Sequence, residues 1–170
     1  MPGGLFFEVF GNYVPRLCID TAVIGPTDTV ELVSWQGFTP VFSWSGSYGI
    51  ALRERHEAPR MGQWGLPGGT MFKGEQPEDA AKRIIKADLG LEIEVLGSIG
   101  YMYFPNEHRT IEVDGTMREL VIDSISLVLI AQAREAKIVS PKTKAGWFRR
   151  PPVRHEYHTP FLETRGLLVP

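Results

Sequence analysis

The side chains with the clearest capacity for chemistry lie in residues 64–91, which read WGLPGGTMFKGEQPEDAAKRIIKADLGL. The second half of this segment is punctuated like a helix, because Pro77 suits a first helical turn and Gly90 suits a helix stop. Asp88 would then lie near the helix end, where an acid opposes the helix dipole. Either Asp88 is a solvated surface acid, or its carboxylate is a ligand for a hard divalent cation such as Mg²⁺.

Histidines supply a second set of candidates. His108 lies beside Glu107 in a polar stretch between two expected strands, and it is the best available general base because histidine titrates near neutral pH. An ordinary surface loop is the alternative there. His155 and His158 superficially suggest zinc, but they are three residues apart, whereas the metalloprotease helix needs a spacing of four. For that pair we expect an ordinary helix face.

The composition excludes several other classes of function. The 170 residues include 18 Lys and Arg against 20 Asp and Glu, so the net charge of −2 offers no general basic field to nucleic acid or anionic lipid. The single cysteine, Cys18, excludes an intramolecular disulfide and a cysteine-rich metal site. No apolar run reaches the roughly 20 residues that span a bilayer, and no signal peptide is recognised. We therefore expect a cytoplasmic protein with no membrane and no nucleic-acid partner.

Short strand-like segments, separated by glycine and proline, must position these groups. One helix is expected in the middle of the chain, Pro77–Leu89, and one at its end, Arg154–Arg165. This order predicts an α+β protein, an α/β/α sandwich with a mixed β-sheet, in a single domain over residues 1–170. The expected strands are Leu17–Ile24, Thr29–Val33, Val41–Trp44, Gly49–Arg53, Leu91–Ile99, Tyr101–Phe104 and Leu120–Ala133, with a polar loop before the last.

Residues 64–91 resemble the signature of the Nudix hydrolase family, G-x5-E-x7-R-E-U-x-E-E-x-G-U, in which U is aliphatic. The residues that fall on their places in this signature without a gap are Gly69, Glu75, Arg83, Ile85, Gly90 and Leu91. The resemblance implies the Nudix α/β/α sandwich and a hydrolase that acts on a nucleoside diphosphate derivative. Glu75 and Arg83 would then either tie the loop to the helix or take part in catalysis.

The same segment departs from the signature where the family binds metal. Ile84 and Ala87 replace two glutamates, so the helix face shared by positions 84 and 88 presents one carboxylate, that of Asp88. The resemblance then implies a site made of the Gly68 carbonyl, Asp88 and two substrate phosphates. Such a site would hold one Mg²⁺, or Mn²⁺, and only weakly before the substrate arrives.

Within the family, the chain resembles the GDP-mannose mannosyl hydrolases, whose signature is also poor in carboxylates. Asp20 falls where that branch binds substrate, and Arg55 falls where it has an arginine near the diphosphate. The implied reaction is substitution at the anomeric carbon of a nucleotide sugar, with the nucleoside diphosphate leaving. Lys142 and Lys144 occupy the late loop that supplies a metal ligand and a histidine base in that branch. These lysines could bind phosphate but not Mg²⁺.

The sequence leaves three functions open. The favoured one is an Mg²⁺-dependent hydrolase that releases a nucleoside diphosphate and a sugar from a small-molecule nucleotide sugar resembling GDP-mannose. The second is a Nudix-fold nucleotide-binding or regulatory module with impaired catalysis, and the third is a hydrolase that cleaves the pyrophosphate bond. A hairpin inserted around residues 27–47, together with its aromatic residues, would need cover, which favours a homodimer.

Overall fold

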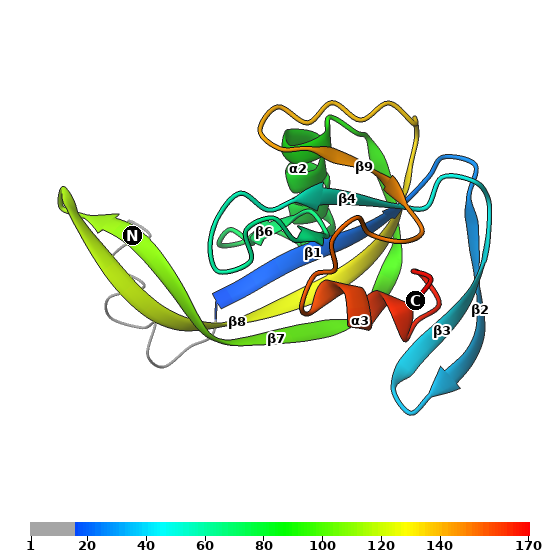
Figure 1. The fold of residues 1–170 in the computed structure, drawn as a ribbon, viewed down its shortest axis with the longest axis horizontal. Helices are drawn as coiled ribbons and strands as arrows, with labels where there is room; N and C mark the ends of the chain where they lie inside the picture. The colour runs from blue at the N-terminus through cyan, green and yellow to red at the C-terminus, as the bar shows by residue number, and fades with distance from the viewer. Residues whose placement is uncertain (1–15) are drawn as a thin grey trace.

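A mixed β-sheet forms the centre of the computed structural model, which describes residues 16–170 (Figure 1). Its strands are β1 (Arg16–Ile24), β4 (Ile50–Glu54), β5 (Trp64–Gly65), β6 (Gly68–Thr70), β7 (Ile93–Val113), β8 (Thr116–Ala133) and β9 (Ala145–Phe148). The main path of the sheet runs β5-β4-β1-β8-β7, with β6 paired to β1 and β9 paired to β4. β1 and β8 run parallel, and the other strand pairs of this sheet are antiparallel.

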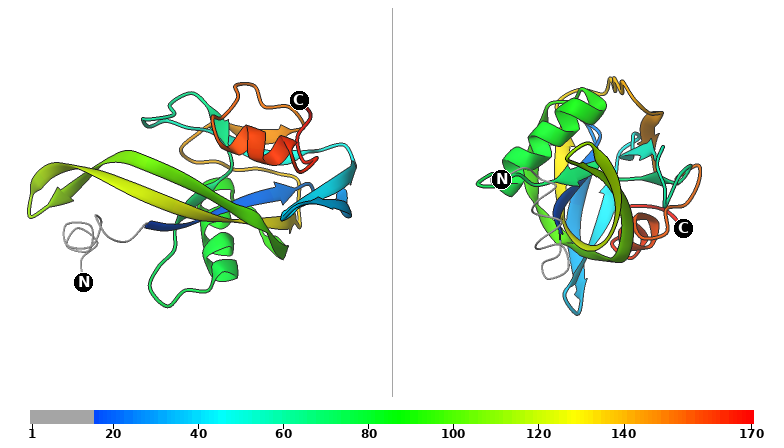
Figure 2. Two further views of the ribbon diagram at one scale, coloured as in Figure 1. Left: turned by 90° about the horizontal axis from the view of Figure 1, so that it is seen from below. Right: turned by 90° about the vertical axis from the view of Figure 1, so that its left-hand side faces the viewer.

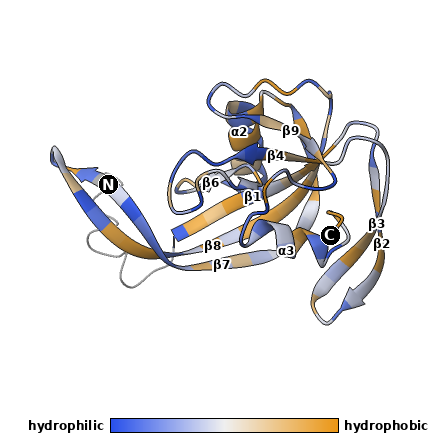
Figure 3. Cartoon of the chain, viewed as in Figure 1, coloured by the Kyte–Doolittle hydropathy of each residue, from blue (hydrophilic) through white to orange (hydrophobic). Residues whose placement is uncertain are grey.

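Helices α2 (Pro77–Leu89) and α3 (His158–Glu163), the two helices within residues 16–170, cover opposite faces of this sheet (Figure 2). Side chains alternate across a strand, so β1 contributes to both layers. Val23 packs in the hydrophobic cluster that contains α2, whereas Ala22 packs in the cluster that contains Leu162 of α3. Figure 3 shows hydrophobic residues gathered in β1 and β8, between the two helices. The predicted α+β sandwich with a mixed sheet is confirmed.

Helix α2 occupies the predicted range, for the predicted local reasons. Pro77 lies in the first turn, and Gly90 ends the helix in the left-handed conformation with φ of 69° and donates its N–H to the carbonyl of Lys86 at 3.1 Å. One face of the helix packs on the sheet. Ile84, which replaces a glutamate of the Nudix signature, is only 5% exposed and belongs to that packed face. The position is therefore part of the core rather than of a ligand site.

The structure corrects the polar loop that we predicted before residue 120. Strands β7 and β8 continue through this stretch and form a long two-stranded arm that projects from the body (Figure 1). The arm turns at Asp114 and Gly115, whose φ angles of 51° and 75° are those of a tight hairpin turn. The Asp114–Gly115 dipeptide itself indicates a hairpin turn, but the polar residues around it favour a loop when only the sequence is considered. The two predicted strands before residue 105 are accordingly one strand, β7.

The terminal helix is also shorter than the predicted range Arg154–Arg165. Helix α3 begins at His158, so Pro160 lies in its first turn, where a missing N–H costs nothing. A helix that began at Arg154 would place Pro160 in its interior and lose a backbone hydrogen bond.

Residues 29–45 form a separate two-stranded sheet, β2 (Thr29–Gln36) and β3 (Thr39–Ser45), within the range where the sequence predicts a hairpin. Gly37 in its turn has φ of 61°, a backbone conformation that favours glycine. At the base, the N–H of Phe42 donates to the carbonyl of Arg165 at 2.9 Å. The hairpin is thus tied to the C-terminal segment. The assignment of the whole chain to one domain stays a prediction.

We expect Ile85→Ala to lower the free energy of unfolding by about 2–5 kcal/mol, because Ile85 is fully buried between α2 and the sheet and its loss leaves a cavity. Lys82→Ala, on the exposed face of the same helix, should stay within about 0.5 kcal/mol of the wild type. Urea unfolding followed by circular dichroism measures both variants. Equal losses in the two variants would contradict this packing of α2.

Candidate active site

Two adjoining cavities lie beside β1 and β4. The first, called here the Asp20 cavity, measures about 190 Å³ and is lined by polar residues from β1, β4, β6, β7 and β8 and from the start of α3. The second, the Asp88 cavity, measures about 260 Å³ and is lined by the end of α2 and by residues 140–143. Arg53, Arg55 and Glu57 line both cavities, so one wall is common to the two.

The Asp20 cavity depends on a glycine. Asp20 of β1 pairs with Gly68 of β6, and a Cβ on Gly68 would lie 1.8 Å from Asp20 Oδ1. Only glycine leaves space for this carboxylate between the strands. Asp20 is 8% exposed, and burial raises its pKa to about 6, while the Ser126 hydroxyl and the Arg55 guanidinium oppose that rise. The structure thus brings together three of the predicted site residues, Asp20, Gly68 and Arg55.

Guanidinium groups outnumber carboxylates around this cavity. Glu107 accepts hydrogen bonds from Arg60 at 2.5 Å and Arg109 at 3.0 Å, and it forms an ion pair with Arg16 at 3.8 Å. Burial opposes ionisation, but the hydrogen bond from Arg60 and the charge of Arg109 hold the pKa of Glu107 below its usual value. A carboxylate bound in this way is a weak base, so Glu107 anchors arginines instead. Among the described residues, the charged groups that line the cavity are Arg16, Arg53, Arg55, Arg60, Arg109, Asp20, Glu57 and Glu107.

Arg55 adds to the positive charge that these pairs leave unbalanced. Its Nε has no hydrogen-bond partner within residues 16–170, and the side chain is half-buried. Burial and the neighbouring charges of Arg109 and Arg53 lower the pKa of its guanidinium, which means that cations are crowded here. Five guanidinium groups against three carboxylates leave an excess of two positive charges in a chain of net charge −2. Such a cavity attracts an anionic ligand, and guanidinium groups suit phosphate oxygens in particular.

Asp88 lies in the neighbouring cavity and is already paired. Its Oδ2 is 3.3 Å from Nε of Arg53; burial raises the pKa of this carboxyl, and the charges of Arg53 and Lys142 oppose the rise. Within residues 16–170 no group of three or more His, Cys, Asp or Glu side chains is arranged to hold a metal ion. Gly68, the other candidate ligand, lines the Asp20 cavity instead. One carboxylate that an arginine already balances does not fit Mg²⁺, which needs several oxygen ligands, so these residues do not form a metal site by themselves.

Glu75 and Arg83 tie the loop before α2 to the helix. Glu75 accepts hydrogen bonds from Arg83 Nε at 2.7 Å and Nη2 at 2.9 Å, and from the N–H of Phe72 at 2.9 Å. Arg83 also donates to the carbonyl of Thr70 at 3.0 Å, and its guanidinium lies 3.8 Å over the Phe72 ring. The bonds from Arg83 and Phe72 lower the pKa of Glu75 to about 2. Neither residue lines the two cavities; Thr70, which Arg83 holds, lines the Asp20 cavity, so the pair positions its wall.

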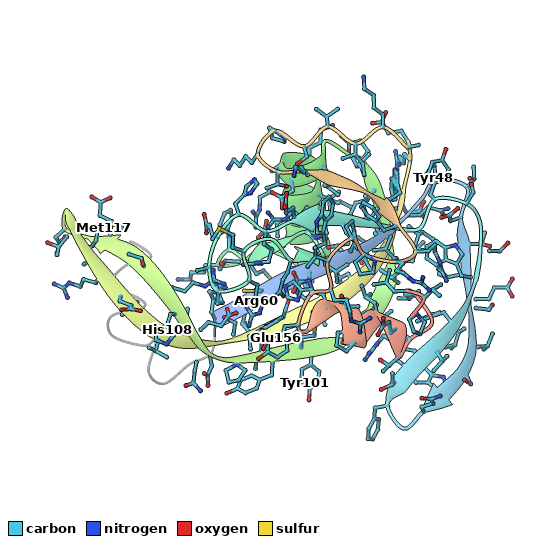
Figure 4. The ribbon with its side chains drawn as sticks, viewed as in Figure 1. Tyr48, Arg60, Tyr101, His108, Met117 and Glu156 are labelled. Carbon is cyan, nitrogen blue, oxygen red and sulfur yellow. The ribbon has the colours of Figure 1, made fainter. Side chains whose placement is uncertain are left out.

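The remaining predicted residues divide between the site and the surface. Lys142 lines the Asp88 cavity, whereas Lys144 is largely exposed and lies 3.5 Å from Glu54. His108 lies on the projecting arm, where its Nδ1 is 2.8 Å from Glu119 and its side chain is mostly exposed. In Figure 4 it is well separated from Arg60 and Glu156, which lie together beside α3. The structure therefore does not bring His108 to the Asp20 or Asp88 cavity.

His155 and His158 are the site residues that the sequence analysis missed. We expected an ordinary helix face, but both side chains are buried and both line the Asp20 cavity. Their contacts come from distant parts of the chain; for example, Nδ1 of His158 accepts the N–H of Leu66 at 2.8 Å. The three-residue spacing of His155 and His158 does not indicate a buried site of this kind. Arg53 and Arg60, which also line the cavity, were not predicted as site residues.

The chain is similar to proteins of one family. A family model described as the NUDIX domain matches residues 41–158. The chain therefore belongs to the NUDIX family, and the predicted family is confirmed. Two solved structures share the fold: a MutT NUDIX hydrolase from Burkholderia pseudomallei (TM-score 0.54, 22% identity, 88% of this chain and 97% of that one) and the NUDIX domain of Shewanella oneidensis NrtR complexed with ADP ribose (TM-score 0.51, 15% identity, 96% of both chains).

Two curated proteins are related in sequence. The low-salt glycan biosynthesis protein Agl8 of Haloferax volcanii is 30% identical over 101 residues, which cover 55% of this chain and 64% of Agl8. The nucleoside triphosphatase NudI of Escherichia coli is 27% identical over 111 residues, which cover 65% of this chain and 78% of NudI. The match thus spans a little under two thirds of the length of Agl8. Among residues 16–170, no helix has the length and apolar character needed to cross a membrane.

Lowering the pH from 7 to 5 should destabilise the folded protein partly through His155. Burial and the charges of Arg55 and Arg60 lower the pKa of His155 from 6.5 to about 3, so between these values the unfolded chain binds a proton that the folded chain does not. This contribution to stability is complete above pH 6.5 and is lost as the pH falls towards 3, by about 2 kcal/mol at pH 5. Urea unfolding at pH 7 and pH 5 should therefore differ less in His155→Asn than in the wild type.

The exposed His108 provides the matched control for this measurement, because its replacement removes a histidine without removing a buried one. His108→Asn should keep the wild-type difference between pH 7 and pH 5. If His155→Asn also kept the whole difference, the buried neutral state of His155 would be wrong.

The pairing of Asp88 with Arg53 predicts weak binding of metal to the free protein. Without nucleotide, adding the protein should leave the electron paramagnetic resonance signal of free Mn²⁺ nearly unattenuated, because a single carboxylate paired with an arginine is a poor ligand set. Arg53→Ala should strengthen Mn²⁺ binding by freeing Asp88, and the double variant Arg53→Ala, Asp88→Asn should lose that gain. Tight binding of one Mn²⁺ by the wild-type protein would contradict this account of the site.

Proposed function

We propose that the protein hydrolyses a nucleotide sugar resembling GDP-mannose and releases a nucleoside diphosphate and a sugar. The observation that carries the proposal is the make-up of the Asp20 cavity, in which an excess of guanidinium groups lies beside a buried carboxylate. A nucleotide sugar has the matching parts, a negatively charged diphosphate and an uncharged, hydroxyl-rich sugar. Family membership supports the coarser class, and the cavity favours the finer one.

In this proposal the arginines receive the diphosphate. Arg55 is the central group, because its Nε lacks a partner among the described residues while Arg60 is committed to Glu107. A diphosphate is a good leaving group only when cations meet its growing charge, and preorganised guanidinium groups in a partly buried cavity do this without reorganisation. Lys142, on the far side of the shared wall, can meet a second phosphate or the outer part of the nucleotide. Asp20, in turn, accepts hydrogen bonds from hydroxyl groups.

Mg²⁺, with Mn²⁺ as the alternative, remains the proposed cofactor because Nudix hydrolases in general use divalent cations. Asp88 and the Gly68 carbonyl remain its proposed ligands. The described side chains supply too few oxygens for an ion on their own, so the substrate's phosphates would have to complete the set. The charge of the leaving diphosphate is therefore assigned to the arginines.

The names of the two relatives favour different reactions. Agl8 is named as a protein of glycan biosynthesis, which supports a sugar-linked nucleotide. NudI is named as a nucleoside triphosphatase, which supports cleavage of a bond between phosphates. A third alternative, a nucleotide-binding module without turnover, is favoured by the pairing of Asp88 with Arg53 and by the burial of Ile84. The cytoplasmic location and the homodimer stay predictions.

The reaction is tested by incubating the protein with GDP-mannose, UDP-glucose and ADP-ribose in excess Mg²⁺ and identifying the products. We expect a nucleoside diphosphate and a free sugar. In water labelled with ¹⁸O, cleavage of the sugar–oxygen bond puts the label in the sugar, whereas cleavage between phosphates puts it in a phosphate. Binding of a nucleotide without any turnover would support the binding module instead.

Arg55→Ala should lower kcat/KM about 100-fold or more, because it removes a charge that meets the leaving diphosphate. Arg154→Ala is the matched control: Arg154 is an exposed arginine paired with Glu163 and lines neither cavity, so its rate should stay within about twofold of the wild type. A wild-type rate in Arg55→Ala would contradict the proposed diphosphate site.

A further inference from the structure

Two buried histidines, to which the reaction proposed above gives no role, line the Asp20 cavity. His155 and His158 are 1% and 3% exposed, and their rings stack with 3.8 Å between centroids and 11° between planes. Gly65 makes room for the stack, since a Cβ there would lie 2.6 Å from Nδ1 of His158 and 2.7 Å from Cδ2 of His155. The pair is therefore packed firmly between β5 and the start of α3.

Backbone hydrogen bonds fix the tautomer of both rings. Nδ1 of His155 accepts the N–H groups of Tyr157 and His158, each at 3.1 Å, and Nδ1 of His158 accepts the N–H of Leu66 at 2.8 Å. A ring nitrogen that accepts a hydrogen bond carries no proton, so each neutral ring carries its proton on Nε2. Burial lowers the pKa of both histidines, which keeps them neutral. Both Nε2–H groups are thus preset as donors.

These donors are unsatisfied. Nε2 of His155 is buried and has no hydrogen-bond partner within residues 16–170. Nε2 of His158 is 3.8 Å from Oδ2 of Asp20, beyond the length of a hydrogen bond. A buried donor without a partner costs free energy, so its presence next to a cavity needs an explanation. A ligand atom that accepts from these groups would supply one.

We propose that His155, His158 and Asp20 form a subsite that binds hydroxyl groups of the sugar of the substrate. This inference rests on the proposed function and names the part of the site that recognises its uncharged end. A hydroxyl group can accept from an imidazole N–H and donate to a carboxylate at the same time, and the cavity offers both kinds of partner side by side. The arginines then hold the diphosphate, so the two ends of the ligand are told apart by charge.

Other occupants fit this subsite less well. A phosphate group would be repelled by the Asp20 carboxylate, and two neutral imidazoles do not attract it as guanidinium groups do. A metal ion would need the lone pair of a ring nitrogen, but Nε2 carries the proton and Nδ1 is engaged by the backbone. A simple packing pair would leave the buried Nε2–H of His155 without a partner. An uncharged polyhydroxyl group is not repelled by the Asp20 carboxylate, needs no lone pair of a ring nitrogen, and can accept a hydrogen bond from an Nε2–H group.

Two substitutions at one position test the subsite. His155→Asn can keep an acceptor for the backbone N–H groups near Nδ1 but lacks the Nε2–H donor, whereas His155→Gln can place an amide N–H near the position of Nε2. Calorimetry measures the affinity of each protein for GDP and GDP-mannose, for UDP and UDP-glucose, and for ADP and ADP-ribose. His155→Asn should lose about tenfold in affinity for the sugar nucleotide but less than about twofold for the nucleoside diphosphate. His155→Gln should recover part of that loss.

The matched ligands separate a failure of this inference from a failure of the proposed function. The histidine subsite is wrong if both His155 variants bind the sugar nucleotide as tightly as the wild type does. It is also wrong if the variants lose the same factor of affinity for the sugar nucleotide and for the nucleoside diphosphate. If sugar nucleotides bind with the expected pattern but are not hydrolysed, the subsite stands and the proposed hydrolysis is wrong. If none of these nucleotides binds, both are wrong.

Nuclear magnetic resonance gives a second measurement that does not depend on the variants. Long-range ¹H–¹⁵N correlation of the imidazole rings should identify the tautomer protonated on Nε2 for His155 and His158. A sugar nucleotide should shift the Nε2–H signal of His155 more than the matching nucleoside diphosphate does. Protonation on Nδ1, or equal shifts with both ligands, would overturn the assignment of these donors.

Discussion

Charge crowding beside a buried carboxylate is the constraint on which the site depends. Removing guanidinium and carboxylate groups from water is costly unless they are paired, and most of the charges here are paired. Glu107 forms ion pairs with Arg60, Arg109 and Arg16, and Asp88 forms one with Arg53. Arg55 forms none of these pairs, and its Nε, like that of Arg16, Arg53 and Arg109, has no hydrogen-bond partner within residues 16–170. The fold thus leaves an excess of positive charge among the arginines of the Asp20 cavity.

Packing and charge pairing also account for the face of α2 that carries Ile84 and Asp88. In this chain Ile84 makes its part of the α2 surface belong to the core, and its side chain lies beside Gly69. Asp88, one turn later, has an arginine beside it instead of further carboxylates. This arrangement needs less metal affinity from the protein and relies more on arginines, which agrees with a ligand that brings its own phosphate oxygens.

Much of the fold could be predicted because its signals are local. The bounds of α2 follow from Pro77 and Gly90, and β1 and β4 differ from their predicted ranges by one residue at each displaced end. The arm formed by β7 and β8 was missed because polarity was given more weight than the Asp114–Gly115 turn. The start of α3 was misjudged because the position of Pro160 was not used. Both errors concern signals that were present in the sequence.

The histidine pair was missed for a different reason. One contact that orients the pair joins distant parts of the chain, because His158 and Leu66 are 92 residues apart. No pattern of spacing around His155 reports such contacts. Likewise, the sequence placed Asp20 and Arg55 as candidates only through a family resemblance.

By itself, then, the sequence determined the family, the central helix and the replacement of two glutamates of the signature by Ile84 and Ala87, because these depend on residue types at short spacings. Only the tertiary structure decided which groups are buried, which arginines are already paired, and on which nitrogen each histidine carries its proton. Those properties depend on the dielectric surroundings and on hydrogen-bond partners that folding brings together.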